Sequence, residues 1–195
     1  MMPSVIEIIA ALSGIVSVWY SKKASVWVYP TGLINTTLYV YISFEAQLVG
    51  EATVNFYYTV MSLYGWYNWL RKDNQQAYIV HVTASTGKEW GLQILFFIFV
   101  YLVLFYTLTF LQGAFFPGAI PWADALASAA AFTGMWLMTQ KKVESWIWWI
   151  ITNICSMPLY YVKGYNFTAV YYAVLLVLAV AGLYQWRKKA NEQAG

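Results

Sequence analysis

Residues 94–111 read ILFFIFVYLVLFYTLTFL, a stretch without a charged residue and with few polar atoms. A helix of this length and composition can cross the hydrocarbon core of a bilayer. The rest of the chain agrees, because 61% of the 195 residues are hydrophobic and 10% are charged. A soluble fold of this composition would lack the polar surface that it needs. The sequence therefore predicts an all-α polytopic membrane protein.

Three more apolar segments lie on each side of this stretch. The expected membrane spans are residues 4–20, 26–44, 51–70, 91–111, 122–139, 145–161 and 166–186. With these spans, ten of the eleven Lys and Arg residues lie on one side of the membrane, and only Lys163 lies on the other. Short loops rich in Lys and Arg stay in the cytoplasm. We therefore expect an external N-terminus and a cytoplasmic C-terminus.

The three segments before the stretch resemble the three that follow it. A carboxylate comes early in each set, and a Gly-x-Tyr-x-Trp pattern comes late, at residues 65–69 and 182–186. Between them each set has a basic turn. The two turns would match Lys22-Lys23, Trp27 and Asn35 with Lys141-Lys142, Trp146 and Asn153.

This internal similarity predicts two parallel three-helix repeats in a single membrane domain, residues 1–195. Residues 4–70 would form repeat one and residues 122–186 repeat two, with residues 91–111 as a lipid-facing linker helix. Repeats related by an axis along the membrane normal are typical of transporters, whose substrate site lies between the repeats near the midplane. The sequence therefore favours a transporter.

Polar and aromatic side chains share one helical face in several segments. Trp146, Trp149 and Asn153, for example, follow a helical spacing in the sixth segment. Polar faces at this depth turn toward the protein interior. Two other roles stay open, because buried Asn residues often join helices and Trp residues often form interfacial belts. The expected ligand contacts are Trp146, Trp149, Asn153, Asn35, Asn55, Tyr58, Ser62 and Tyr160.

Charge restricts the ligand. The predicted spans contain no Lys or Arg, so a phosphate at the midplane would have no cationic partner. Aromatic faces favour a flat ring, and a cationic ring most of all. We therefore expect an unphosphorylated, aromatic, cationic metabolite. Glu7 and Asp124 have two possible roles, either coupling transport to protons or stabilising the helix N-termini at which they lie.

Other functional classes have less support from the sequence. An intramembrane enzyme needs a nucleophile with a base, or clustered metal ligands, within its spans. The chain has one Cys and one His, and the His lies in a polar loop. We therefore expect no catalytic residue, no metal site and no cofactor. The net charge of +3 follows from membrane topology and needs no nucleic-acid partner. A membrane protein without transport activity stays as the alternative from a different class.

The same residues resemble the PnuC family of vitamin transporters. Glu144, Trp146, Trp149 and Asn153 match the region of its W-x-x-W-x-x-x-N pattern. Residues 64–69, YGWYNW, match the G-W-Y-x-W ending of its third helix. Shorter similarities occur at residues 32–35 and at Trp122 with Asp124, so the resemblance covers nearly the whole chain.

The resemblance implies a seven-helix relative of the SWEET fold, arranged 3+1+3, that forms a homotrimer within the lipid of a bacterial cytoplasmic (inner) membrane. It also implies vitamin uptake by facilitated diffusion, with a cytoplasmic kinase that traps the vitamin by phosphorylation. Family members carry nicotinamide riboside, and related branches carry thiamine or riboflavin. We expect nicotinamide riboside. Thiamine is the alternative, because Asn55 and Ser62 stand where riboside carriers tend to have Gln and Asn; riboflavin is less favoured.

Overall fold

The computed structural model describes residues 5–45, 49–115 and 119–194. Over these residues the chain forms seven α-helices and, outside the helices, two isolated β-bridges. One lies within the segment before α4 (Lys72 with Tyr78), and the other joins that segment to the turn after α5 (Thr83 with Lys142). The predicted all-α fold is thereby confirmed, with one helix for each expected span. The helices are α1 (Val5–Lys22), α2 (Val28–Glu45), α3 (Val49–Leu70), α4 (Gly87–Phe115), α5 (Pro121–Thr139), α6 (Ser145–Val162) and α7 (Asn166–Ala194).

The helices differ in how apolar they are. Three are long and apolar enough to cross a membrane by themselves: α1, the Gly87–Leu111 part of α4, and the Asn166–Gln193 part of α7. Helices α2, α3 and α6 carry polar side chains that line an internal cavity, including Asn35, Asn55 and Asn153. Those side chains make the helices less apolar without exposing polar groups to lipid.

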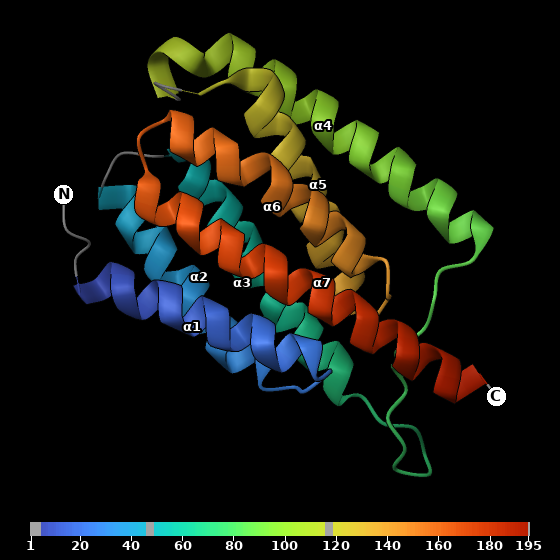
Figure 1. Ribbon diagram of the computed structural model, residues 1–195. Coiled ribbons are helices and arrows are strands. Elements are labelled where there is room, and N and C mark those ends of the chain that lie inside the picture. The colour runs from blue at the N-terminus through green and yellow to red at the C-terminus, as the bar shows by residue number, and fades with distance from the viewer. Residues whose placement is uncertain (1–4, 46–48, 116–118, 195) are drawn as a thin grey trace.

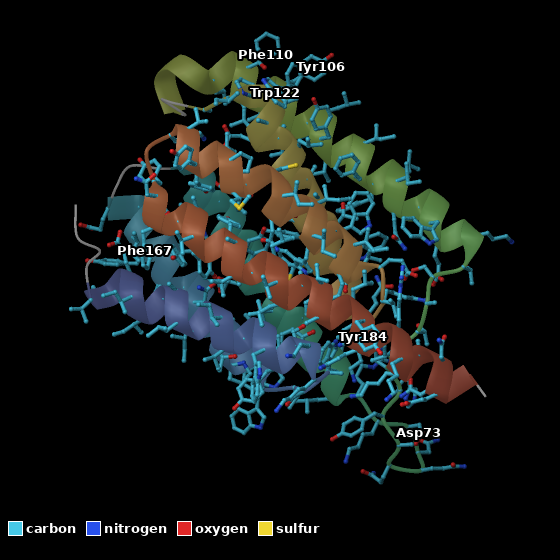
Figure 2. The ribbon with its side chains drawn as sticks, viewed as in Figure 1. Asp73, Tyr106, Phe110, Trp122, Phe167 and Tyr184 are labelled. Atoms are coloured by element: carbon cyan, nitrogen blue, oxygen red, sulfur yellow. The ribbon has the colours of Figure 1, made fainter. Side chains whose placement is uncertain are left out.

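Helix α4 lies at the edge of the bundle, where it packs against α5 (Figure 1). Its large apolar side chains project outward, as Tyr106 and Phe110 do in Figure 2. Phe110 is 80% exposed and Phe99 is 63% exposed. This is the arrangement expected of a linker helix that faces lipid. The remaining six helices of the described residues pack as two sets, α1–α3 and α5–α7, which meet through α1 with α7 and α3 with α5.

A constant spacing relates the two sets. Helix α2 begins at Val28 and α6 at Ser145, which is 117 positions later (the difference between 145 and 28). The starts of α3 and α7, Val49 and Asn166, have the same spacing, as do the ends of α1 and α5 and the ends of α2 and α6. The boundaries of the helices therefore agree with a repeated three-helix unit.

The match through the two basic turns is wrong by two positions. The constant spacing pairs Trp146 with Tyr29 and not with Trp27. Trp146 and Tyr29 are each 1% exposed, whereas Trp27 is 60% exposed. The Lys pairs at 22–23 and 141–142 occupy different places in turns of equal length. Basic residues in these turns reflect membrane topology, which fixes the side of the membrane and not the position within the turn.

The corrected pairing also explains two glycines. The Tyr29 ring lies across Gly65 of α3, and the Trp146 ring lies across Gly182 of α7. At both glycines an added Cβ would lie within 2.6 Å of ring atoms, so only glycine allows this approach. By the same spacing Asn153 corresponds to Thr36, and not to Asn35.

We call the end of the bundle where α1, α3, α5 and α7 begin the N-end, and the end where α1, α3 and α5 finish the C-end. Four aromatic rings meet in series at the C-end and form what we call the C-end cluster: Tyr29, Trp69, Trp186 and Trp146. Successive ring centroids are 5.1, 6.1 and 5.6 Å apart. The rings are nearly fully buried, with exposures of 2% or less.

Two equivalent hydrogen bonds join the repeats beside this cluster. Trp69 Nε1 donates to the carbonyl of Met138 (3.2 Å), and Trp186 Nε1 donates to the carbonyl of Ser21 (3.0 Å). Donors and acceptors are both related by the 117-residue spacing. The hydroxyl of Ser21 also lies 3.0 Å from the sulfur of Met138, so equivalent positions touch each other. The repeats are therefore bonded together at the C-end.

Candidate functional site

A cavity of about 950 Å³ lies between the two repeats. It extends from Glu7, Asp124 and Lys163 at the N-end to Tyr29 and Trp146 of the C-end cluster. The structure brings all ten candidate residues from the sequence to this one cavity, although their contact with a ligand stays a prediction. They are Trp146, Trp149, Asn153, Asn35, Asn55, Tyr58, Ser62, Tyr160, Glu7 and Asp124.

An aromatic wall lines the middle of the cavity. The centroid of the Trp149 ring is 5.9 Å from that of Tyr58, which is 6.4 Å from that of Phe132. Tyr57 stacks on Phe132 at 4.0 Å, and its hydroxyl donates to the Phe132 carbonyl (3.1 Å). These contacts join α3 to α5 and hold the wall in place. Sequence reasoning missed Phe132, because it lies in an alanine-rich segment without a polar stripe.

Three polar side chains on the cavity lack protein partners. Ser62, Asn153 and Ser156 are 4%, 3% and 3% exposed. None of them forms a side-chain hydrogen bond to another of the described residues. Buried polar groups in native proteins are nearly always hydrogen-bonded. Their free donors and acceptors therefore suit a polar ligand beside the aromatic wall.

Asn35 has the structural role that the sequence left open. Its Nδ2 donates to the carbonyl of Ala10 (2.7 Å), which joins α2 to α1. The side chain of Asn35 also contacts Tyr171 across Gly14, where an added Cβ would collide with both. Asn35 still lines the cavity, but part of its hydrogen-bonding capacity is already used.

The floor of the cavity belongs to the C-end cluster. The hydroxyl of Tyr29 and the indole N–H of Trp146 are buried and have no partner among the described residues. Both residues line the cavity, and they occupy equivalent positions in the two repeats. The sequence pointed to Trp146 but not to Tyr29, because the incorrect pairing of the basic turns placed Trp27 opposite Trp146.

An ion pair lies at the N-end of the cavity. Lys163 Nζ is 2.7 and 2.9 Å from the two carboxylate oxygens of Asp124, and both side chains are about one-fifth exposed (20% and 22%). Asp124 also accepts the backbone N–H of Ile120, so it stabilises the start of α5. Stabilising the helix N-terminus is one of the two roles that the sequence left open for Asp124. Sequence reasoning missed the partner, because Lys163 lies 39 positions away.

The charge around the cavity follows from these residues. Among the lining residues that the structure describes, Glu7, Asp124 and Lys163 carry the charges. These lining residues are two carboxylates and one ammonium group, so their net charge favours cations over anions. Within the described ranges, no group of three or more His, Cys, Asp or Glu side chains could hold a metal ion.

Two equivalent sets of membrane helices around a shared, largely aromatic cavity define a membrane transporter built from repeats. The chain belongs to the PnuC family: residues 4–188 match the family model described as nicotinamide mononucleotide transporter. The predicted family resemblance is confirmed, and with it a multi-pass membrane protein that carries a small molecule.

Individual relatives agree with this family. The nicotinamide riboside transporter PnuC of Escherichia coli K12 is 26% identical over 96% of this chain and 87% of its own length. The riboflavin/roseoflavin transporter RibM of Streptomyces davaonensis is 25% identical over 92% of this chain and 83% of its own length. The crystal structure of the vitamin B3 transporter PnuC matches with a TM-score of 0.78 at 24% identity, over 96% of this chain and 82% of that one. This last match shows that the fold is shared.

Proposed function

We propose that this protein carries nicotinamide riboside across the cytoplasmic membrane of a bacterium. One observation carries the proposal: an aromatic wall lies beside the buried residues Ser62, Asn153 and Ser156, whose side chains have no hydrogen-bond partner among the described residues. A flat nicotinamide ring can stack on the wall, and its positive charge strengthens that contact. The ribose hydroxyls and the amide can then satisfy the free serine and asparagine groups. The relatives named as nicotinamide riboside transporters support the same ligand.

The charges around the cavity favour the riboside over the mononucleotide that the family description names. A phosphate in a cavity needs cationic partners, and the lining cation, Lys163, is already paired with Asp124. The second carboxylate, Glu7, would repel a phosphate further. An unphosphorylated cation meets neither obstacle.

A ligand titration tests the proposal. Quenching of intrinsic Trp fluorescence in the purified protein is measured with nicotinamide riboside, nicotinamide mononucleotide, thiamine and riboflavin. We expect the riboside to bind at least about tenfold more tightly than the mononucleotide, the effect of roughly one unsatisfied charge contact. Tighter binding of the mononucleotide would overturn the argument from charge, and tighter binding of thiamine or riboflavin would reassign the substrate.

We propose further that the C-end faces the cytoplasm, since the basic turns lie there. Uptake then proceeds by facilitated diffusion, and a cytoplasmic riboside kinase traps the product. The matching measurement is riboside entry into proteoliposomes with and without an enclosed kinase and ATP. We expect the total riboside and its phosphorylated product to exceed the external concentration only when both the kinase and ATP are enclosed.

The homotrimer implied by the family resemblance is a proposal too, and light scattering of the detergent-solubilised protein measures it.

A further inference from the structure

We infer that Glu144, Ser85 and Gln93 are positioning residues that fix the rotation of α6, and thereby place Trp146 and Trp149 for the ligand. This inference rests on the proposed ligand site. The residues belong to what we call the α6 network: Glu144, Ser85, Gln93 and Trp148. It lies on the side of α6 that faces α4, outside the cavity.

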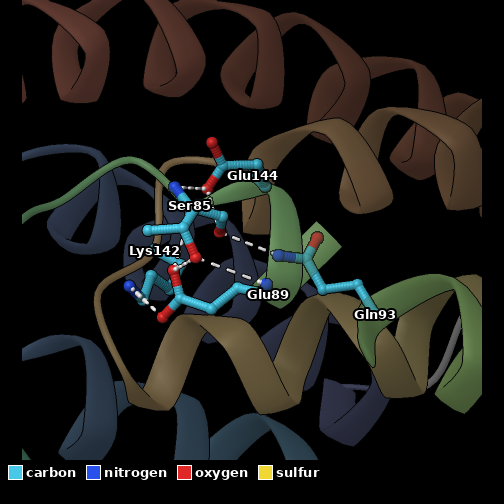
Figure 3. A network of polar contacts seen from close by, with 6 residues as sticks. Ser85, Glu89, Gln93, Lys142 and Glu144 are labelled. Atoms are coloured by element: carbon cyan, nitrogen blue, oxygen red, sulfur yellow. Dashed lines mark hydrogen bonds and ion pairs between the residues drawn. The ribbon is translucent and has the colours of Figure 1, made fainter. Parts of the chain in front are cut away.

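The α6 network runs from Glu144 at the start of α6 through Ser85 to Gln93 of α4, as Figure 3 shows, and Trp148 returns it to α6 one turn later. One oxygen of the Glu144 carboxylate accepts both the backbone N–H (2.9 Å) and the hydroxyl (2.6 Å) of Ser85. The Ser85 hydroxyl in turn accepts Gln93 Nε2 (2.8 Å). Gln93 Oε1 then accepts the indole N–H of Trp148 (3.1 Å). Glu144, at the start of α6, and Trp148, four positions later, are thus held from the same side.

Three of the four residues of the network are buried, and Ser85 is partly buried. Glu144 is 7% exposed, Trp148 is 6% exposed and Gln93 is fully buried. Buried hydrogen bonds, especially those to a carboxylate, resist exchange with water. The ring of Trp148 also packs against Phe97 of α4, with centroids 4.9 Å apart. These contacts restrain rotation of α6 and not only its position.

Backbone contacts fix the segment that carries Ser85. Thr83 accepts the N–H of Val143 (3.0 Å) and donates to the carbonyl of Lys141 (3.2 Å). An ion pair between Lys142 Nζ and Glu89 (2.6 Å) holds the start of α4 to the same turn, as Figure 3 shows. The segment before α4 therefore cannot slide along the start of α6 without breaking these bonds.

Rotation of α6 matters because of where its Trp residues point. Trp148 bonds to α4, whereas Trp146 and Trp149 line the cavity from the same helix. Successive residues of a helix project about 100° apart, so turning Trp148 away from Gln93 turns Trp149 away from Tyr58 by the same angle. Ligand contacts that are misplaced by about 1 Å lose much of their value.

Among the residues that the structure describes, the equivalent helix of repeat one has no such network. The 117-residue spacing pairs Glu144 with Trp27, which is 60% exposed, and Trp148 with Thr31. The hydroxyl of Thr31 bonds within its own helix, to Trp27 and Val28. A three-helix repeat thus folds without these contacts. They are found on the repeat whose middle helix carries the two Trp residues of the proposed site.

A double-mutant cycle tests this inference, with nicotinamide riboside as the probe. Gln93→Leu should weaken binding about tenfold, a size typical of coupled neighbours, and should cost clearly less in a Trp149→Ala background, where only Trp146 and Asn153 of α6 remain to be misplaced. Equal losses in both backgrounds would overturn the positioning role, because a general structural defect acts whether or not Trp149 is present. Ser85→Ala should behave like Gln93→Leu, and Ser85→Thr should restore affinity because it keeps the hydroxyl. Thr31→Val is the matched control on α2 and should leave affinity unchanged.

A measurement without ligand separates this inference from the proposed substrate. Hydrogen exchange of the backbone amides of residues 146–153 should become faster in Gln93→Leu, while residues 29–36 of α2 keep the wild-type rate. Unchanged exchange in α6 would contradict the inference whatever the substrate is. If the wild-type protein failed to bind riboside while α6 exchange rose in the variant, the proposed substrate would be wrong and the role of the network would stand.

Discussion

Asn153, Ser62 and Ser156 carry buried polar groups without partners among the described residues. Their polar atoms open onto the cavity and are not among the fully buried atoms without a partner. A polar group there in place of a packed apolar one costs folding free energy, up to about 1–3 kcal/mol where it stays unpaired, and a ligand that supplies hydrogen bonds offsets that cost. At this scale, binding and stability oppose each other at the same side chains.

Asn153→Leu should therefore separate the two properties. Replacing the unpartnered amide with an apolar side chain of similar volume should raise the free energy of unfolding by about 1 kcal/mol and weaken riboside binding tenfold or more. Thermal unfolding and isothermal calorimetry of the same preparation measure both. Asn68→Leu is the matched control, because Asn68 is also buried (7% exposed) but bonds to the carbonyl of Thr139 (2.8 Å). The Asn68→Leu protein should have a lower free energy of unfolding and an unchanged affinity for the riboside. A less stable Asn153→Leu protein with normal affinity would count against the site.

Lys141 predicts a pH dependence of stability. Burial, with Lys189 nearby, lowers the pKa of Lys141 to about 8. The ammonium group lies 4.6 Å from the centroid of the Trp69 ring and donates to the carbonyl of Val80 (3.0 Å). An unfolded lysine keeps its proton up to a pKa of about 10.4. Between these values the unfolded chain binds more protons, so the free energy of unfolding rises with pH.

We therefore compare the free energy of unfolding of the wild type with that of Lys141→Gln. The difference between the two should grow in favour of the wild type by about 1 kcal/mol from pH 7.5 to pH 9.5, after allowance for partial exposure. Thermal unfolding of both proteins in detergent at these two pH values measures the difference. Lys188→Gln serves as the control, since Lys188 is largely exposed (69%). A constant difference between wild type and Lys141→Gln would show that Lys141 titrates normally.

At the scale of the helix, α2 and α6 occupy equivalent places but have different chemistry. Both lay an aromatic ring across a glycine of the third helix, and both rings end in the C-end cluster. We expect release of a ligand at the C-end to require separation of this cluster. The hydrogen bonds from Trp69 to Met138 and from Trp186 to Ser21 would then break in the same step.

Removal of these two donors should open the C-end. Trp69→Phe with Trp186→Phe keeps aromatic rings in place but deletes both N–H groups, at about 1 kcal/mol for each hydrogen bond. In a Cys155→Ser, Ser21→Cys background, a hydrophilic maleimide should then label position 21 roughly tenfold faster. Trp136→Phe, in α5 and packed against Phe96, should leave the labelling rate unchanged. Equal rates in the double variant and the parent would mean that other contacts close this end.

The helices and their order could be predicted from the sequence, because uninterrupted apolar segments need only be counted and measured. The face of α6 could be predicted too, since Trp146, Trp149 and Asn153 follow the period of a helix. Phe132, Tyr29 and the Asp124–Lys163 pair could not, because each depends on which helices become neighbours. The pairing of the basic turns was wrong because Lys residues mark a side of the membrane and tolerate a shift of two positions.

For the whole molecule, the cavity reaches charged residues at the N-end and ends at bonded aromatic rings at the C-end. The repeats are joined at the C-end by the indole hydrogen bonds of Trp69 and Trp186, and beside the aromatic wall by Tyr57 of α3 with Phe132 of α5. Helix α4 packs on α5, so repeat two carries an additional helix that repeat one lacks. We expect this asymmetry to make the four-helix unit of α4–α7 the more rigid half, against which α1–α3 would move.

Riboside uptake should not need an ion gradient. Asp124 is occupied by Lys163, so it is poorly suited to bind and release a proton during transport. Proteoliposomes should take up riboside to the external concentration at the same rate with and without an imposed proton or sodium gradient. The double variant Asp124→Asn, Lys163→Met should retain this gradient-independent uptake. Accumulation driven by a proton gradient, and lost in Asp124→Asn or Glu7→Gln, would instead assign a carboxylate to coupling.

The constant spacing of 117 residues also constrains how the two halves diverged. Because helix boundaries and turn lengths coincide, the halves differ between the end of the first helix and the start of the third by substitution, with no net insertion or deletion. A carboxylate in place of Trp27 and an indole in place of Thr31 are such substitutions. An ancestral symmetric pair could therefore have become specialised one codon at a time, and segments of α2 and α6 can be exchanged in chimaeras without adjusting their length.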